Sequence, residues 1–359
     1  MSNPNQSNRP RPILMTPLRR CGSHALRLRL NFNKQFYSPY PLHIVDLMPL
    51  VKRHYADLSD DNVYFQLIRD VIGLQDALMV RWGDVAFDPV DIFNAIKDQP
   101  RSVHRVTWEL LLQAGERHNA RVVMDKSLDN VHYADELVEM MPDIGFLNVV
   151  RDPRAQVDSM TRAIIHEFDI LPNARIWVES MNASRRLMAK YPERVLTVRF
   201  EDFLTNQELV LRKICEFMGI DFMPEMLDVS SSPEANKLTW LSNLWESNSS
   251  APIPANAAKF RRNLSMEEIE IIETVTKEHM EYFGYELMTP ANTNITKELE
   301  DAAMARSHRN REKAWADLKV ATPHDYILRR YRADTIAMIG ERLQNRPWFD
   351  NPQPAAGAI

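Results

Sequence analysis

Short apolar runs alternate with longer amphipathic stretches along most of this chain. Four of the runs have the length and composition of buried strands, and they occupy residues 12–16, 121–124, 146–150 and 195–200. Apolar positions with helical spacing lie between and after them, over residues 131–141, 155–166, 173–190, 207–218 and 265–283. Parallel strands need crossover connections, and helices between strands supply them. The pattern therefore predicts an α/β fold with a parallel sheet flanked by helices.

Two of these helices carry clear end signals. Thr205 or Asn206 is a suitable N-cap for the helix over 207–218, and Gly219 follows as a C-terminal stop. Ser265 and Glu268 have the spacing of a capping box, in which each residue satisfies a backbone amide at the helix start. This box predicts that a helix opens there and runs to about residue 283.

One segment admits two interpretations. Residues 25–30 alternate strictly between apolar and basic side chains from Leu26 onward, and this period of two is typical of a strand. The segment also follows directly after a glycine-containing turn, a position that suits a helix. The local pattern leaves strand and helix open.

The composition changes past residue 289, and this change sets a predicted domain boundary. The predicted parts are a disordered arm at 1–10, a main α/β domain at 11–289, a helical C-terminal extension at 290–350 and a frayed tail at 351–359. Within the extension, charged helical patterns cover residues 298–318 and 326–343. The extension suits a solvated appendage, a dimer arm or an active-site lid.

Composition and charge exclude several classes of protein. The 359 residues carry a formal net charge of −5, which argues against a surface built for nucleic acid. Two cysteines, Cys21 and Cys215, cannot form a disulfide framework, so we expect a reducing, cytoplasmic location. No apolar run approaches the ~20 residues that span a bilayer, and the polar start of the chain contains no secretory signal, so no transmembrane segment is expected.

The first candidate for chemistry is the basic turn after the first predicted strand. No Walker A loop, dinucleotide-binding glycine triplet or metal-binding His or Cys motif is present, and the sequence offers no metal site. The turn instead reads Arg19-Arg20-Cys21-Gly22-Ser23-His24. Glycine lets backbone amides converge, and guanidinium and hydroxyl groups there favour an anion at a helix start. A solvated basic loop is the other interpretation of the same residues.

A second candidate follows the strand at 146–150. Arg151 comes directly after this strand, and Ser159 lies eight residues further on, within a predicted helix. Ligands of parallel sheets gather at the carboxyl ends of the strands. An arginine at a strand end is also suited to bidentate phosphate binding. We therefore expect Arg151 and Ser159 to converge on the same crevice as Arg20.

Together the two segments resemble the sulfotransferases that use PAPS (3′-phosphoadenosine 5′-phosphosulfate). In that family a basic, glycine-containing loop after the first strand binds the 5′-phosphosulfate, and an Arg-Asp-Pro-Arg-Ala segment with a later serine binds the 3′-phosphate. The order and spacing fit over about residues 12–285, although Cys21 and His24 depart from the usual loop. Supporting matches are Asp125-Lys126-Ser127, Arg199-Phe200-Glu201-Asp202, Phe217-Met218-Gly219 and Lys259-Phe260-Arg261-Arg262. The resemblance implies a P-loop-NTPase-like sulfotransferase fold.

The resemblance also implies a division of labour among the residues. Arg20 would neutralise charge on the leaving phosphate, while Arg151 and Ser159 would hold the 3′-phosphate and Arg261 or Arg262 would close over it. The donor-binding residues that it implies are Arg19, Arg20, Cys21, Gly22, Ser23, His24, Ala25, Arg151, Ser159, Phe200, Arg261 and Arg262. Sulfuryl transfer depends on positioning and charge stabilisation, and no metal is required.

The acceptor still needs a general base. The stretch Lys126-Ser127-Leu128-Asp129 lacks the histidine that the cytosolic branch of the family carries. His43 lies in a proline-rich segment about twenty residues after the loop, where other branches carry a glutamate, and histidine has a suitable pKa near neutrality. We therefore take His43 as the catalytic base together with Arg20. His24 is the rival, and Asp46 is a weaker candidate.

The functional prediction is an in-line transfer of the sulfuryl group from PAPS to a hydroxyl or amine. The acceptor would be a small molecule, a lipid or a sugar, and not a nucleic acid. The Golgi-type relatives carry an N-terminal anchor that the sequence printed here does not contain, which favours the cytoplasm. A homodimer through the C-terminal helices is a further expectation. The alternatives are a P-loop-type nucleotide or small-molecule kinase and a non-catalytic nucleotide-binding protein.

Overall fold

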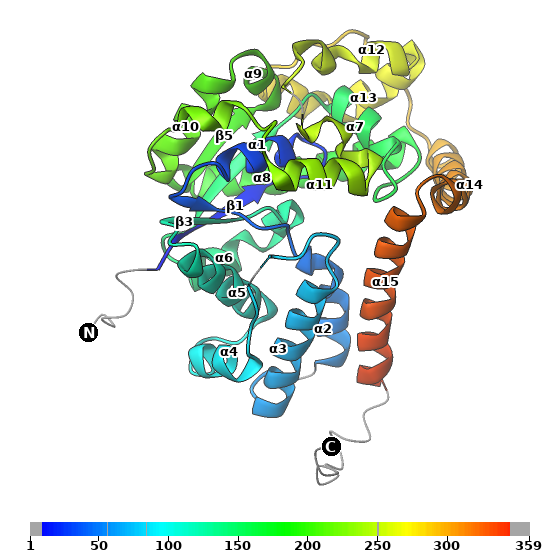
Figure 1. The fold of residues 1–359 in the computed structure, drawn as a ribbon. Helices are drawn as coiled ribbons and strands as arrows, with labels where there is room; N and C mark the ends of the chain where they lie inside the picture. Colours follow the sequence, from blue (N-terminus) through cyan, green and yellow to red (C-terminus); the bar gives the residue numbers. More distant parts are fainter. Residues whose placement is uncertain (1–8, 56, 84, 250, 345–359) are drawn as a thin grey trace. The chain divides into compact units, whose positions relative to one another are not determined.

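The runs that the pattern assigns to strands form a parallel sheet in the computed structural model, which describes residues 9–344 except 56, 84 and 250. The strands are β1 (Arg11–Thr16), β2 (Phe36–Tyr37), β3 (Val122–Asp125), β4 (Gly145–Val150) and β5 (Val195–Arg199). Their order is β2-β3-β1-β4-β5, and every neighbouring pair is parallel (Figure 1). The predicted fold class is confirmed, and the two-residue β2 is the strand that the pattern missed.

The chain divides into two compact units. The described residues up to Pro41 form the first unit with Leu111–Tyr326, and Leu42–Leu110 form the second with the described residues from Ile327 onward. All five strands belong to the first unit. The domain boundaries predicted from the sequence stay predictions, and the predicted tail at 351–359 and residues 1–8 of the predicted arm lie outside the described residues.

Most helices belong to the first unit. They are α1 (Ser23–Leu30), η3 (Leu128–Tyr133), α6 (Ala134–Met140), α7 (Pro153–Thr161), α8 (Ile170–Lys190), η4 (Pro192–Arg194), α9 (Phe200–Thr205), α10 (Gln207–Met218), η5 (Pro224–Leu227), α11 (Pro233–Leu241), η6 (Asn243–Ser249), η7 (Pro254–Ala258), α12 (Phe260–Asn263), α13 (Met266–Tyr282) and α14 (Lys297–Ala321). The labels beginning with η mark short 3-10 helices.

The second unit is helical. Its elements are η2 (Ile44–Asp46), α2 (Met48–His54), α3 (Asp61–Asp76) and α4 (Pro89–Ile96), and α5 (Val103–Arg117) and α15 (Pro323–Gln344) contribute residues to both units. Within this unit α15 buries Ile339 and Leu343, and its Arg342 forms an ion pair with Asp70 of α3. The prediction of two helices in the C-terminal region is confirmed by α14 and α15.

Apolar side chains cover both faces of the sheet, as a parallel sheet requires. Ile13, Met15 and Leu147 belong to one core cluster, together with buried side chains of α1, α9 and α10. Val150 belongs to a second cluster, together with Trp177 of α8 and buried side chains of α7 and α13. The carboxyl ends of β1 and β4 are thus held between two packed layers.

The segment at 25–30, whose pattern left strand and helix open, belongs to helix α1. Its alternation of apolar and basic residues is misleading because the basic side chains are buried as well. Arg27 and Arg29 are both almost fully buried in α1. Arg27 donates to the carbonyl of Ser38 at 2.7 Å and pairs with Glu234, while Arg29 donates to Gln207 at 2.6 Å. The alternation of apolar and basic residues therefore does not divide a buried face from a solvent face, because both kinds of side chain lie inside.

Four predicted helix boundaries differ from those in the structure. The helix expected at 131–141 begins as the 3-10 turns of η3, and the one expected at 155–166 is α7, which ends at Thr161. The Asp152 and Asp169 side chains accept from amides two residues ahead, so α7 and α8 both begin earlier than expected. The Asn206 cap, the Gly219 stop and the Ser265–Glu268 capping box are confirmed.

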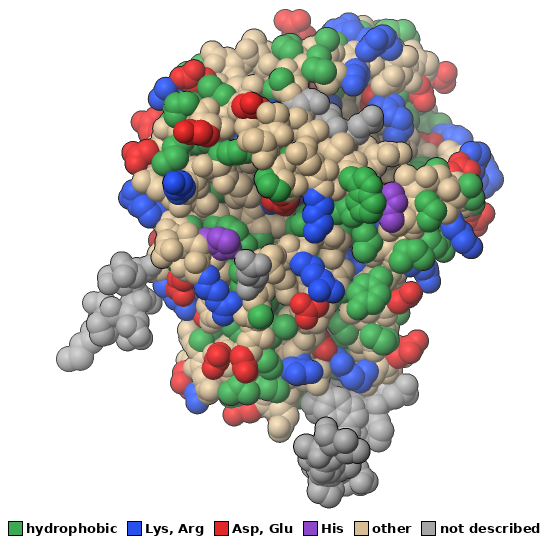
Figure 2. All heavy atoms as spheres, viewed as in Figure 1, with side chains coloured by type: hydrophobic (Ala, Val, Ile, Leu, Met, Phe, Trp, Pro, Cys, Tyr) green, Lys and Arg blue, Asp and Glu red, His purple; other side chains and the backbone are tan. Residues whose placement is uncertain are grey.

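The surface mixes both signs of charge. On the face that Figure 2 displays, basic and acidic side chains are interspersed. Within the described part of the chain, no helix is long and apolar enough to cross a membrane.

Candidate active site

The turn between β1 and α1 adopts a backbone that few residues accept. Arg20 and Gly22 both have positive φ angles, 71° and 90°. A Cβ atom on Gly22 would lie 2.0 Å from Cε2 of Phe200, so no other residue fits there without movement. The turn brings the first amides of α1 beyond the end of β1, and the first turn of α1 contains no acidic residue. Amides at a helix start, with arginines beside them, favour an anion.

The structure brings together three of the predicted donor-binding residues. Nε of Arg20 donates to Oγ of Ser159 at 3.1 Å, and a terminal nitrogen of Arg151 donates to the carbonyl of Arg20 at 2.7 Å. These contacts join the loop after β1, the end of β4 and helix α7. The expected convergence of Arg20, Arg151 and Ser159 is therefore present, and the carboxyl edge of the sheet explains it.

Arg151 lies against the ring of Phe200. Its guanidinium carbon is 5.2 Å from the ring centroid, and the same ring fills the space beside Gly22. Burial lowers the pKa of Arg151, which the Glu201 carboxylate partly offsets, and arginine stays charged at any working pH. Its Nε is buried and makes no hydrogen bond with the described residues. Arg151 thus keeps donor capacity for an anionic ligand.

Lys126 is a site residue that the sequence analysis used only as motif support. It follows β3, its side chain is buried, and its Nζ is 3.5 Å from Oγ of the buried Ser23. Burial and then the charge of Arg27 lower the pKa of Lys126 to about 7. A polar residue directly after a buried strand is the signal that could have found it, since Arg151 carries the same signal.

The other loop residues have varied surroundings. Arg19 forms an ion pair with Asp129 at 2.6 Å, and the carbonyl of Ala25 accepts from Arg29 at 3.0 Å. Burial raises the pKa of Cys21 to about 11, so this residue is a neutral thiol. The ring of His24 packs 5.7 Å from Trp245 and 5.9 Å from Tyr40, measured between centroids. Trp245 follows Leu244, whose carbonyl accepts from Arg20 at 3.2 Å.

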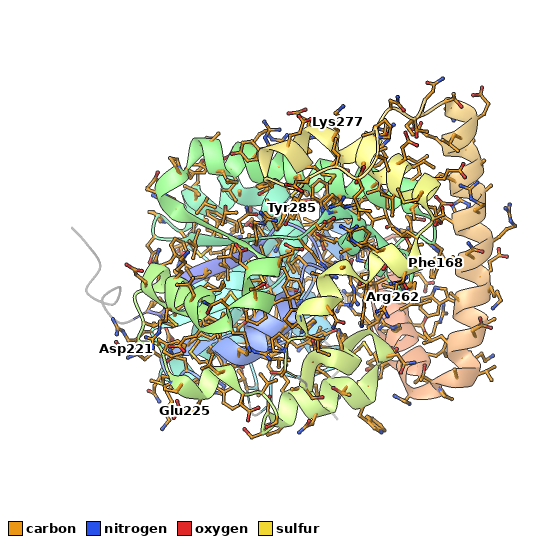
Figure 3. The ribbon with its side chains drawn as sticks, turned by 90° about the horizontal axis from the view of Figure 1, so that it is seen from above. Phe168, Asp221, Glu225, Arg262, Lys277 and Tyr285 are labelled. Atoms are coloured by element: carbon orange, nitrogen blue, oxygen red, sulfur yellow. The ribbon has the colours of Figure 1, made fainter. Side chains whose placement is uncertain are left out.

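The remaining predicted residues belong to other elements of the chain. Arg261 and Arg262 are exposed on α12, and Figure 3 labels Arg262. The next residue, Asn263, donates to Asp158 of α7 at 2.9 Å. His43 belongs to the second unit, where it precedes η2 with a φ of 50°. Among the described residues, no group of three or more His, Cys, Asp or Glu side chains is arranged to hold a metal ion.

Comparison with known proteins identifies the family to which these features belong. A family profile described as "Sulfotransferase family" matches residues 12–224, which is more than half of the chain. The chain belongs to the sulfotransferase family. A second profile of this family, described as "Sulfotransferase domain", matches residues 173–284. As a sulfotransferase, the protein is a transferase that moves a sulfuryl group from a donor to an acceptor.

The chain is also similar to solved structures. The sulfotransferase domain of the olefin synthase from Synechococcus PCC 7002 is 21% identical, the match covers 79% of this chain and 98% of that one, and the TM-score is 0.50. The sulfotransferase domain of the curacin biosynthetic pathway is 16% identical over 77% of this chain and 98% of that one, with a TM-score of 0.49. No curated protein matches this sulfotransferase. At 21% identity and a TM-score of 0.50, the Synechococcus structure supports the sulfotransferase fold alone.

Proposed function

We propose that this sulfotransferase uses PAPS as its donor and transfers the sulfuryl group to a hydroxyl or amine of a small molecule, lipid or sugar. The convergence of Arg20, Arg151 and Ser159 beside the start of α1 carries the proposal. PAPS has two separate anionic groups, and the site has two separate sets of donors at one sheet edge. A cytoplasmic location and a homodimer through the C-terminal helices stay predictions.

The residues present suit both ends of the donor. The amides from Gly22 to Ala25, the Ser23 hydroxyl and Lys126 are the groups that would hold the 5′-phosphosulfate, because they surround the start of α1. Arg151 and Ser159 would hold the 3′-phosphate. Arg19, Cys21 and His24 belong to the same loop, and the ring of Phe200 packs beside Gly22 and against the guanidinium of Arg151. Arg261 or Arg262 on the exposed α12 would close over the 3′-phosphate.

The chemistry then requires two further functions from the chain. The donor supplies an activated sulfuryl group, and Arg20 would offset the negative charge that collects on the leaving phosphate. A base must take the proton of the acceptor, and a histidine suits that role near neutral pH. His43 and His24 are the candidates that the sequence suggests, with Asp46 behind them.

A thermal unfolding series with PAP, the desulfated coproduct, tests the donor. PAP at a hundredfold excess over its dissociation constant should stabilise the folded state by about 2.7 kcal/mol, while AMP at the same concentration should have little effect. Transfer from PAPS to a panel of phenols, alcohols, amines, lipids and sugars then identifies the acceptor. A shift with ATP alone would support a kinase, and PAP binding without any transfer would support a non-catalytic nucleotide-binding protein. No shift in the unfolding temperature with PAP or with ATP would contradict the proposal.

The lowered pKa of Lys126 predicts how donor binding depends on pH. The phosphosulfate prefers the charged lysine, whose pKa in the free protein is lowered to about 7, so each pH unit above 7 should weaken PAP binding by up to about tenfold. Lys126→Met should bind PAP more weakly at pH 7 and lose this slope. Measuring the PAP affinity of both proteins from pH 7 to 9 checks this prediction. The ionisation of PAP affects both proteins equally, so it cancels in the difference between them. Equal slopes in the two proteins would exclude Lys126 from the donor site.

A further inference from the structure

Gln156 is a buried polar residue to which neither the sequence analysis nor the proposed function gives a role. It lies on α7, between Arg151 and Ser159 in the sequence, and its side chain is 0% exposed. A buried amide must satisfy its donors and its acceptor within the protein, because an unpaired polar group in the interior costs free energy. The partners of Gln156 therefore indicate what its side chain does.

The Gln156 amide connects the core to the loop after β1. Its Nε2 atom donates to the carbonyl of Arg19 at 2.8 Å and to the carbonyl of Leu18 at 3.3 Å. Its Oε1 atom accepts from the indole Nε1 of Trp177, on α8, at 3.1 Å. Helices α7 and α8 pack together in the second core cluster (Figure 1). Gln156 thus joins this packed layer to the backbone just before Arg20.

Trp177 fixes the orientation of the Gln156 amide. An indole N–H can only donate a hydrogen bond, and a backbone carbonyl can only accept one. All three bonds therefore form in a single orientation, with the amide oxygen toward Trp177 and the nitrogen toward the loop. Trp177 is itself 0% exposed, so no water competes for its indole. The core thus determines which end of the amide the loop meets.

The residue that follows these two carbonyls has an unusual backbone. Arg20 has a φ of 71°, in the left-handed region, which is costly for a residue with a side chain. Such a conformation persists where the surrounding structure holds it. Gln156 binds the two carbonyls before Arg20, and Arg151 donates to the carbonyl of Arg20 itself at 2.7 Å. Three consecutive carbonyls of the turn are therefore held by side chains.

The backbone conformation of Arg20 determines where its guanidinium lies. Nε donates to Oγ of Ser159 at 3.1 Å, and a terminal nitrogen donates to the carbonyl of Leu244 at 3.2 Å. If φ relaxed to the ordinary region, the Cα–Cβ bond of Arg20 would point in another direction relative to the preceding chain. The guanidinium would then leave its position beside Ser159. Holding the turn and placing the guanidinium are thus one task.

We propose that Gln156 is a positioning residue for sulfuryl transfer, which holds the left-handed turn that places the Arg20 guanidinium at the leaving phosphate. This inference rests on the proposed function, in which Arg20 offsets the charge that collects on that phosphate. The Gln156 amide is occupied by the loop and by Trp177, so it acts through Arg20 and not on the donor. The charge on the leaving phosphate develops in the transition state. Loss of Gln156 should therefore lower kcat more than donor affinity.

Replacement of Gln156 by methionine tests the proposal, because it keeps the size of the side chain and removes the amide. The full chain is assayed with PAPS and the acceptor found in the panel, below the unfolding temperature of every variant. Gln156→Met should lower kcat by about ten- to a hundredfold, as expected for a slight misplacement of a reacting group. The dissociation constant of PAP should stay within about threefold of the wild-type value. Wild-type kcat in Gln156→Met would overturn the inference and leave the proposed function intact.

Asn33→Leu is the matched control. Asn33 is also a 0% exposed amide, and it donates to the carbonyl of Asp221 at 2.6 Å. It precedes β2, so it lies at the edge of the parallel sheet opposite to the carboxyl ends of the strands. Asn33→Leu should lower the melting temperature and leave kcat unchanged. An equal loss of kcat in Asn33→Leu and Gln156→Met would mean that any lost buried amide impairs turnover, which would overturn the positioning role.

A double-variant cycle with Arg20 separates positioning from general stability. Because Gln156 acts through Arg20, adding Gln156→Met to Arg20→Ala should change kcat by less than about twofold. A loss of the same size in the presence and in the absence of the Arg20 guanidinium would overturn the inference. If the wild type neither binds PAP nor transfers the sulfuryl group from PAPS, the proposed function itself fails, and the inference fails with it.

Trp177→Phe keeps the proposal testable if Gln156→Met does not fold. This change removes the donor to Oε1 of Gln156 and retains an aromatic ring. It should lower kcat by about three- to tenfold, as for the loss of one neutral hydrogen bond, at nearly unchanged PAP affinity. In the Arg20→Ala protein the same change should have no further effect on kcat. A lower melting temperature with wild-type kcat in Trp177→Phe would contradict the proposed role of the oriented amide.

Discussion

Replacing Arg151 by alanine is expected to weaken PAP binding by about thirty- to several-thousandfold. Loss of one partner from a buried, charge-assisted contact costs about 2–5 kcal/mol, and 1.4 kcal/mol is tenfold in affinity. Arg151 stands at the end of β4 with its Nε unused by the described residues, and Phe200 supports its guanidinium at 5.2 Å. Titration of both proteins with PAP by calorimetry measures the change.

AMP is the control ligand for this prediction. AMP lacks the 3′-phosphate, so Arg151→Ala should leave the affinity for AMP nearly unchanged and remove most of the preference for PAP. An equal loss of affinity for PAP and AMP would mean that Arg151 does not bind the 3′-phosphate. Its role would then be to hold the loop through its bond to the carbonyl of Arg20. Arg162→Ala removes an arginine of similar charge at the exposed end of α7 and should leave PAP binding unchanged.

The sequence was sufficient to predict the sheet and the meeting of its loops. Apolar runs such as the one before Arg151 are buried on both faces, so they stand out without any alternation. Once the strands are parallel, residues directly after them share one edge, and this rule alone placed Arg20 near Arg151. The two segments are about 130 residues apart, and topology brings them together, not local propensity.

What could not be predicted depends on partners far away in the chain. Arg27 is buried because Glu234 and the carbonyl of Ser38 satisfy it, and nothing in residues 25–30 reveals these partners. Lys126 is neutralised in part by burial, which only the packed core creates. In each case a charged or polar residue has a role that only tertiary contacts define.

The conformation of the loop itself gives a second prediction with a large effect. Gly22→Ala should lower the free energy of unfolding by about 2–5 kcal/mol, as the sum of the left-handed backbone cost and the overpacking cost of a buried methyl group. The methyl group would meet the ring of Phe200 at 2.0 Å, and that ring contacts both Phe203 and Arg151. Because the guanidinium of Arg151 lies against this ring, a shift of the ring should displace Arg151 and weaken PAP binding as well. Chemical denaturation and a PAP titration of the variant measure both effects.

Two further variants separate the causes. Gly219 has a similar φ of 70°, and nothing lies within 4 Å of the position of its added Cβ, so Gly219→Ala should show the backbone cost alone, about 1–2 kcal/mol, and should bind PAP normally. Phe200→Leu makes room beside residue 22, so the double variant should be more stable than the sum of the two single changes implies. Equal destabilisation by Gly22→Ala and Gly219→Ala would mean that the ring yields easily. The close approach of Phe200 to the loop would then not be what holds Arg151 at the donor site.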